Sequence, residues 1–151
     1  MCNHIHDTTN LDKVVAYVIY RTSRILRFRL VKFFQEQGIN ISPEQWFILV
    51  RLFQQAGQSQ GELADRDLND HPNITRLLDA LERAELIERR SDPNDRRRTL
   101  VYLSAQGTRM MEQLLPLVFE ERKRLFDGFS NTEIATLIQM LNRIEHNALH
   151  I

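Results

Sequence analysis

The sequence predicts a mainly α-helical protein with one small β-hairpin. Apolar residues recur at three- and four-residue intervals over most of the 151-residue chain, which is the period of an amphipathic helix. The period becomes that of β-strands only between Leu86 and Leu103. Ser42, Ser59 and Ser130 each stand three residues before a Glu or Gln, the capping-box pattern that begins a helix.

The first helix is expected to begin after Asn10, which can cap it, and to end at Gly38. About 27 residues at 1.5 Å each span roughly 40 Å, longer than a compact domain of this size needs. Between Val14 and Tyr20 the segment is apolar almost all round, so more than one of its faces must be buried. We therefore expect a second copy of the chain to cover the extra face. A central core helix of a monomer is the alternative.

The remaining elements follow from caps, helix breakers and the change of period. Pro116 is expected to kink or break the helix in which it lies. The loop between the two strands, 91–97, is basic and rich in turn-forming residues. In chain order we expect helices over about 43–56, 60–66 and from Pro72, strands over 86–90 and 99–103, and helices over about 104–126 and 131–149.

Charge and composition narrow the class of protein. The chain has 20 Lys and Arg against 20 Asp and Glu, so its net charge favours neither nucleic acid nor a membrane as partner. Five arginines and only two acids, however, lie between Arg89 and Arg98. Cys2 is the single cysteine, which excludes an internal disulfide and suits a reducing compartment. With no apolar run near ~20 residues and no signal-peptide pattern, we expect a soluble, cytoplasmic protein.

A short helix, a tight turn, a second helix and a basic hairpin together make a winged helix-turn-helix. Glu62-Leu63-Ala64-Asp65, followed by Asn73-Ile74-Thr75-Arg76-Leu77-Leu78-Asp79, resembles this region in the MarR family of bacterial transcription regulators. The basic loop resembles the family more specifically. Asp92-Pro93-Asn94-Asp95-Arg96-Arg97, then Leu103-Ser104 and Gly107, follows its pattern D-P-x-D-x-R … L-[ST]-x-x-G.

The resemblance covers nearly the whole chain. It implies a winged helix-turn-helix DNA-binding region over 38–103 and a helical dimerisation region over 11–37 and 104–151, in one compact domain. Residues 1–10 lie outside the resemblance and show no periodic pattern, so we expect a disordered tail there. It also implies a homodimeric, sequence-specific regulator, a repressor, that binds a pseudo-palindromic operator on double-stranded DNA. Where the family has glycine, this chain has Asn69 and Glu85, and Ser104 stands for threonine. Glu85 either avoids a positive φ or carries a small strain.

The DNA-facing residues are expected on the second helix and in the basic loop. Asn73 can pair with adenine, Thr75 can meet a thymine methyl group or a phosphate, and Arg76 can reach guanine or a phosphate. The resemblance assigns Arg97 to the minor groove, with Asp95 holding its guanidinium group. The alternatives are a solvated helix face and an ordinary surface pair. The candidate DNA-binding residues are Pro72, Asn73, Thr75, Arg76, Asp95, Arg96, Arg97 and Arg98.

An effector site is a further expectation. In regulators that this chain resembles, small aromatic acids bind between the DNA-binding and dimerisation regions. Tyr20, Arg24 and Phe28 follow one another at four-residue intervals, so they share a helix face that could stack on such an acid, with Trp46 beside it. The alternative is that Trp46 and the tyrosines are core and that Arg24 pairs with Glu120 or Glu121.

Other site types are not expected. The sequence offers five potential metal ligands, but their spacing matches no strong zinc pattern: Cys2, His4, His6, His146 and His150. A redox-sensing role for Cys2 is not expected either, because peroxide-sensing relatives carry their cysteine within the first helix and Cys2 lies outside it. Gly-rich phosphate loops, G-x-S-x-G and metal quartets are absent from the sequence, so we expect neither an enzyme nor a cofactor. The rival function is a helical ligand- or protein-binding dimer that does not bind DNA, which the intact basic loop disfavours.

Overall fold

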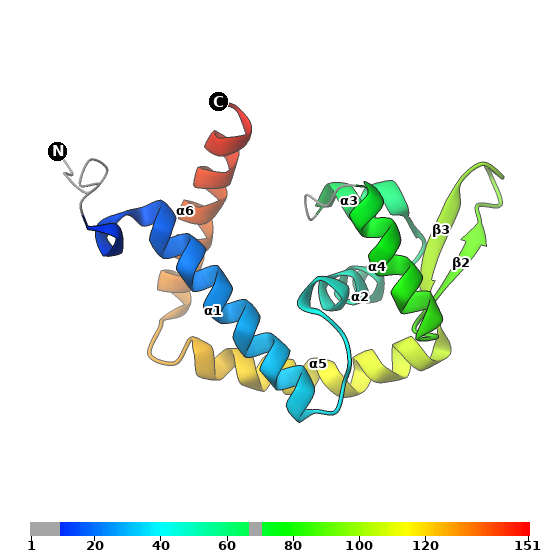
Figure 1. Cartoon of the computed structure of the whole chain (residues 1–151), viewed down its shortest axis with the longest axis horizontal. Helices are drawn as coiled ribbons and strands as arrows, with labels where there is room; N and C mark the ends of the chain where they lie inside the picture. The colour runs from blue at the N-terminus through cyan, green and yellow to red at the C-terminus, as the bar shows by residue number, and fades with distance from the viewer. Residues whose placement is uncertain (1–9, 67–70) are drawn as a thin grey trace. The chain divides into compact units, whose positions relative to one another are not determined.

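The computed structural model describes residues 10–66 and 71–151 (Figure 1). The structure is mainly α-helical and includes one three-stranded antiparallel sheet, as the sequence predicts. The chain divides into two compact units, Met1–Met111 and Glu112–Ile151. No helix of the described part is both long and apolar enough to span a bilayer.

The chain's first described elements are a short 3₁₀ turn, η2 (Leu11–Lys13), and a long helix, α1 (Val15–Glu36). The prediction of one continuous helix from Leu11 is wrong, because Val14 between them has extended backbone. Asn10 caps the 3₁₀ turn, with its side-chain oxygen accepting from the N–H of Asp12 at 3.1 Å. Gly38, at φ 70°, ends α1 as predicted.

Helix α2 (Pro43–Gln54) carries much of the core of the first unit. Its capping box is complete: the side chain of Ser42 accepts from the N–H of Gln45, and the Gln45 side chain accepts from the N–H of Ser42. Trp46 is 1% exposed, and its ring lies 5.6 Å from that of Phe34 on α1. The other buried residues of this helix are Pro43, Ile48, Leu49 and Leu52.

Helices α3 (Gln60–Arg66) and α4 (His71–Arg83) form the predicted helix pair. Ser59 and Glu62 make the predicted capping box at the start of α3, with bonds of 3.2 and 2.8 Å. Helix α4 turns one apolar face inward, as predicted. That face consists of Ile74, Leu77, Leu78 and Leu81.

The sheet holds the predicted hairpin, β2 (Ile87–Ser91) and β3 (Thr99–Leu103), and one strand that was not predicted, β1 (Gln58–Ser59). The strand order is β1-β3-β2, so β3 is central and pairs with both neighbours through Val101 and Leu100. Two residues are too few to show an alternating pattern, which is why β1 has no sequence signal. The β2–β3 hairpin projects beyond α4 as a wing (Figure 1).

The turn between α4 and the wing is tied to the helix that follows the wing. Glu85 has a φ of 60°, so this non-glycine residue does not avoid a positive φ and carries the small backbone strain that the sequence left open. The Ser104 hydroxyl donates to the carbonyl oxygen of Glu85 at 2.6 Å and accepts from the N–H of Gly107 at 2.9 Å. Ser104 thereby caps helix α5 (Ala105–Leu125), as expected.

Pro116 lies inside α5 without ending it, so the expected break is wrong, and the alternative, a kink, stays a prediction. A proline removes one backbone hydrogen bond of a helix, and flanking helix formers such as Leu115 and Glu112 can sustain the rest. Helix α6 (Asn131–Leu149) begins at the predicted capping box of Ser130 and Glu133. In the single chain, none of the described residues of α6 is buried, although the helix carries an apolar stripe that includes Leu137, Ile138 and Ile144.

Candidate nucleic-acid interface

The first turns of α4 present the predicted base-contacting residues. Pro72 and Arg76 are exposed, and Asn73 and Thr75 are half-buried. Arg76 Nη2 donates to Asn73 Oδ1 at 2.8 Å, which joins two neighbours on one face of the helix. The hydroxyl of Thr75 accepts from the side-chain amide of Gln60, which starts α3. These side chains are therefore held by contacts within the helix pair.

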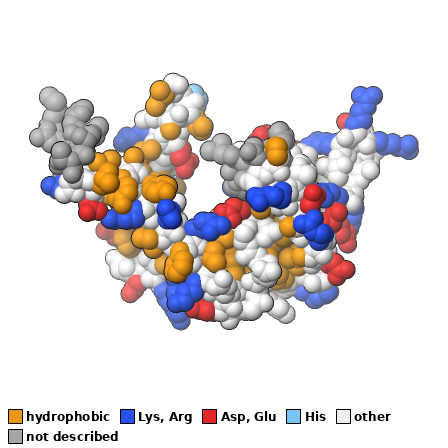
Figure 2. All heavy atoms as spheres, in the orientation of Figure 1, with side chains coloured by type: hydrophobic (Ala, Val, Ile, Leu, Met, Phe, Trp, Pro, Cys, Tyr) orange, Lys and Arg blue, Asp and Glu red, His pale blue; other side chains and the backbone are white. Residues whose placement is uncertain are grey.

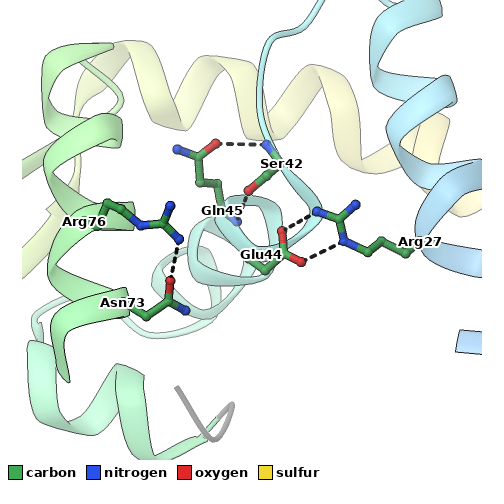
Figure 3. A network of polar contacts seen from close by, with 6 residues as sticks. All are labelled: Arg27, Ser42, Glu44, Gln45, Asn73 and Arg76. Carbon is green, nitrogen blue, oxygen red and sulfur yellow. Dashed lines mark hydrogen bonds and ion pairs between the residues drawn. The ribbon is translucent and has the colours of Figure 1, made fainter. Parts of the chain in front are cut away.

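Asn73 and Arg76 also border an open pocket between α1, α2 and α4 (Figure 3). Its volume is about 530 Å³. Arg27 of α1 reaches the start of α2, where its Nε and Nη2 donate to the two carboxylate oxygens of Glu44 at 2.9 and 3.2 Å. The pocket is lined by Arg27, Ser42, Glu44, Gln45, Asn73, Arg76, Leu77 and Ala80.

Electrostatics across the pocket favour this bidentate pair. Partial burial favours the neutral form of Glu44, but hydrogen bonds and the charge of Arg27 outweigh it and hold the pKa of Glu44 below its ordinary value. The same hydrogen bond and the charge of Glu44 raise the pKa of Arg27. Both groups are thus ionised, and α1 is bound to α2 by a fork-on-fork ion pair. Sequence spacing gave no sign of it, because 17 residues separate the partners.

The wing loop is closed by backbone contacts. The N–H of Asp92 donates to the carbonyl of Arg98 at 2.8 Å, and the N–H of Arg98 donates to the carbonyl of Asp95 at 2.9 Å. The Asp95 carboxylate accepts from the backbone N–H of Arg97 at 3.0 Å, not from its guanidinium group as the resemblance implies. A carboxylate two residues before an N–H readily forms this turn, which leaves the longer arginine side chain to point elsewhere.

Acidic neighbours divide the five arginines of 89–98 into two groups. Arg89 on β2 pairs with Asp79 and Glu82 of α4, with N···O distances of 2.7 and 3.4 Å. Arg90 pairs with Glu88 at 2.7 Å and lies 4.7 Å from the centre of the Tyr102 ring.

Arg98, a predicted DNA contact, pairs with Glu62 of α3 at 2.5 Å. Arg96 and Arg97 are exposed and form no ion pair with any residue that the structure describes. Figure 2 shows cationic side chains projecting from the tip of the wing. The tip therefore carries the two arginines of this segment that form no ion pair with a described residue, while the Asp92 and Asp95 carboxylates beside them accept from backbone N–H groups.

The structure brings together only part of the candidate effector site. On α1, Tyr20 is 57% exposed and Phe28 is 70% exposed, and Arg24 Nη1 donates to the Tyr20 hydroxyl at 3.1 Å. Trp46 instead lies in the core, as the alternative interpretation has it. That interpretation also made the tyrosines core, which the exposure of Tyr20 contradicts.

The histidines do not form a metal cluster in the described part of the chain. His146 and His150 stack at a ring distance of 4.2 Å, and the carbonyl of His146 lies 2.7 Å from His150 Nδ1. Within 10–66 and 71–151 no three His, Cys, Asp or Glu side chains are grouped to hold a metal. Cys2, His4, His6 and Asn69, which the sequence singled out, lie outside the described residues.

Comparison with known proteins identifies relatives over most of the chain. The model of the MarR family matches residues 41–99. The HTH-type transcriptional regulator MhqR of Bacillus subtilis (strain 168) is 27% identical over 131 residues, which are 87% of this chain and 89% of MhqR.

Two solved structures extend the match. The crystal structure of MarR is similar at 32% identity and a TM-score of 0.64, over 89% of this chain and 98% of that one. The MepR–DNA complex of S. aureus shares the fold at 24% identity and a TM-score of 0.78, over 89% and 96% of the two chains. The named relatives are regulators rather than enzymes. With this coverage and the winged helix-turn-helix above, the chain belongs to the MarR family of DNA-binding transcriptional regulators.

Proposed function

We propose that this protein is a cytoplasmic repressor that binds a pseudo-palindromic operator as a homodimer. The distribution of the wing arginines is the observation that carries the proposal. Acids neutralise Arg89, Arg90 and Arg98, whereas Arg96 and Arg97 extend from the tip without such a partner among the described residues. A narrow minor groove concentrates negative potential and attracts arginine of this kind.

The exposed face of α4 completes the proposed interface. The N-terminal turns of a recognition helix meet base edges in the major groove, and Asn73 and Arg76 occupy these turns. Their hydrogen bond would present an amide and a guanidinium group as one unit. The MepR relative, whose structure is a DNA complex, supports the same use of this fold.

Exposed apolar side chains support the dimer. Val15, Ile25 and Phe28 on α1 are each more than half exposed in the single chain, as is Ile138 on α6. Figure 2 shows hydrophobic side chains over α1. Apolar patches of this kind mark protein interfaces. Two DNA-binding regions related by a two-fold axis would recognise half-sites about one helical turn apart.

We further propose that a small aromatic acid releases the protein from DNA. The pocket beside α4 has a volume of about 530 Å³ and contains two arginines, Arg27 and Arg76. An incoming carboxylate could compete with Glu44 for Arg27 and draw Arg76 away from DNA. Such a ligand acts only if it binds the DNA-free state more tightly. The exposed Tyr20 and Arg24 on α1 offer a second place for the acid, without Trp46.

Selection of fragments from the protein's own genome tests the proposal. Retained fragments are footprinted, and transcription from a promoter that overlaps the operator is measured in vitro. We expect a dyad-symmetric footprint at physiological salt and reduced transcription. Increased transcription would contradict a repressor, and footprints without a dyad would contradict a symmetric dimer. Failure to retain DNA even at low salt would favour the helical binding dimer without DNA-binding activity.

Salicylate is a suitable probe of the effector proposal. Its titration should release the operator and change the fluorescence of Trp46, which is buried close to the start of α2. Arg27→Met and Arg24→Met separate the two proposed places, because only the variant that removes the ligand's cation should abolish the response. Unchanged DNA affinity of the parent at millimolar salicylate and other aromatic acids would contradict this effector class.

A further inference from the structure

One carboxylate connects the wing to the start of α3. Arg98 precedes β3 and Glu62 lies in the first turn of α3, 36 residues earlier. Arg98 Nη2 donates to Glu62 Oε1 at 2.5 Å. The second oxygen of Glu62, Oε2, accepts from the backbone N–H of Ser59 at 2.8 Å. Glu62 therefore caps α3 and holds Arg98 at the same time.

The backbone of Arg98 is also the point at which the wing loop closes. Its carbonyl accepts from Asp92 and its N–H donates to Asp95. On one side of Arg98 lies β3, which is paired on both edges. On the other side lies the exposed tip with Arg96 and Arg97. The orientation of the tip relative to α3 therefore depends on where the side chain of Arg98 is anchored.

We propose that Arg98 is a positioning residue for DNA binding rather than a DNA contact. Paired with Glu62, it fixes the wing tip relative to α3 and α4, so that Arg97 and α4 can enter their two grooves together. A wing that is already oriented loses less conformational freedom when DNA binds. Because this role presupposes the proposed contacts of Arg97 and α4, it specifies how that interface is assembled.

The exposure of the pair indicates that it acts on binding more than on folding. The side chains of Arg98 and Glu62 are 44% and 48% exposed. Ion pairs as exposed as this contribute little to the stability of a fold. A link between two elements 36 residues apart can nevertheless restrict their relative motion. The neutralised Arg98 also contributes less positive potential to DNA than Arg96 or Arg97.

The competing interpretation is that a DNA phosphate takes Arg98 away from Glu62. The two interpretations predict opposite effects of Glu62→Gln. If Arg98 contacts phosphate, the variant frees this arginine, removes a repulsive carboxylate and tightens binding. If Arg98 positions the wing, the same variant loosens the tip and weakens binding. Glutamine keeps the side-chain oxygen that a capping box needs, so α3 stays capped.

The experiment compares Glu62→Gln, Arg98→Gln, the double variant and the charge exchange Glu62→Arg with Arg98→Glu. Affinity for a duplex selected from the genome by the parent is measured over a series of salt concentrations. We expect each single variant to weaken binding by up to about five-fold and the double variant to be no weaker. The dependence on salt should stay that of the parent, and the charge exchange should restore most of the affinity.

A matched control breaks an ion pair that lies within one strand of the wing. Glu88→Gln releases Arg90, which is bound to Glu88 on β2 itself. This variant should leave affinity unchanged or tighten it. Tighter binding by Glu62→Gln, or a salt dependence lowered by about one phosphate contact in Arg98→Gln, would overturn the proposal.

Hydrogen exchange gives a second readout that needs no DNA. The amides of Asp92 and Arg98, which close the wing loop, should exchange faster in Glu62→Gln and Arg98→Gln than in the parent or in Glu88→Gln. Unchanged exchange would overturn the positioning role. If the parent retained no DNA, the proposed function would fail, and the exchange rates would still decide whether Glu62 holds the wing.

Discussion

A Cβ atom added at Gly107 would lie 2.0 Å from the carbonyl oxygen of Leu86. That oxygen accepts the N–H of Ser104 at 3.0 Å, so the backbone before the wing and the backbone that starts α5 are in direct contact. The obstacle is main chain rather than the end of a flexible side chain. The contact therefore leaves room for glycine only.

Gly107→Ala should lower the free energy of unfolding by more than about 2 kcal/mol, because the clash can be relieved only by moving backbone. Urea unfolding monitored by circular dichroism measures the change. The matched control is Gly61→Ala, since a Cβ there meets nothing closer than Ser59 Oγ at 3.9 Å. We expect the control to stay within about 1 kcal/mol of the parent. Equal effects of the two variants would contradict the clash.

Arg97→Ala should weaken operator binding by about 1–3 kcal/mol and reduce the salt dependence by roughly one phosphate equivalent. The guanidinium group of Arg97 forms no ion pair within the described residues, so its charge is available to DNA. Fluorescence anisotropy with a labelled operator at several salt concentrations measures both quantities. Affinity equal to that of the parent at physiological salt would show that the wing tip does not enter the groove.

Arg89→Ala provides the contrast, since Asp79 and Glu82 already neutralise Arg89. This variant should leave the salt dependence of operator binding unchanged.

Arg76→Ala and Asn73→Ala, by comparison, should alter which operator sequences are preferred, because base contacts specify sequence and phosphate contacts do not. Selection from a randomised duplex pool measures that preference. A uniform loss across all sequences would assign both residues to phosphate instead.

Ile138→Glu should shift the protein from dimer to monomer, because Ile138 on α6 is 52% exposed in the single chain and is proposed to be covered by a second copy. Burying an unpaired carboxylate in an apolar interface is costly. Sedimentation velocity at micromolar protein measures the mass. Gln139→Glu adds the same charge at an exposed neighbouring position and should stay dimeric. A parent that sediments as a monomer would contradict the homodimer.

Glu44→Gln should change how stability depends on pH. The pKa of Glu44 lies below its ordinary value of 4.5, so its ion pair with Arg27 stabilises the folded state above pH 4.5. That contribution is lost as the pH falls through the lowered pKa. With side chains 39–55% exposed, the pair is worth less than about 1 kcal/mol.

The free energy of unfolding of the parent should therefore exceed that of Glu44→Gln by a constant amount above pH 4.5, and this difference should shrink at lower pH. Urea titrations at several pH values measure the difference. Arg27→Met removes the partner of Glu44. When Glu44→Gln is compared with unchanged Glu44 in that background, most of the pH dependence of the difference in unfolding free energy should disappear. A difference that grew on acidification would have the wrong sign for this pair.

The parts of the fold that sequence could predict depend on partners close in the chain. Ser42, Ser59 and Ser130 meet the residues that complete their capping boxes three positions later, and the structure confirms all three boxes. The apolar face of α4 follows from the helical period in the same way. Each of these features is decided within one or two turns of a helix.

The features that sequence could not predict depend on distant or competing contacts. Strand β1 exists because β3 pairs with it, and Arg98 is occupied because Glu62 lies beside the wing in the folded chain. Trp46 illustrates a second difficulty. An aromatic residue at helical spacing fits a core and a ligand site equally well, and only packing against Phe34 distinguishes them. The backbone contact of Asp95 is likewise invisible to a family pattern.

The ion pairs of Arg89, Arg90 and Arg98 with acidic side chains should affect how strongly the protein binds DNA of arbitrary sequence. Attraction to DNA of arbitrary sequence comes from uncompensated cations that meet phosphates. Roughly 10⁶–10⁹ competing sites surround any operator in a cell. Because acids pair with three of the five wing arginines, we expect the protein to spend less time on those sites than a variant in which all five were unpaired.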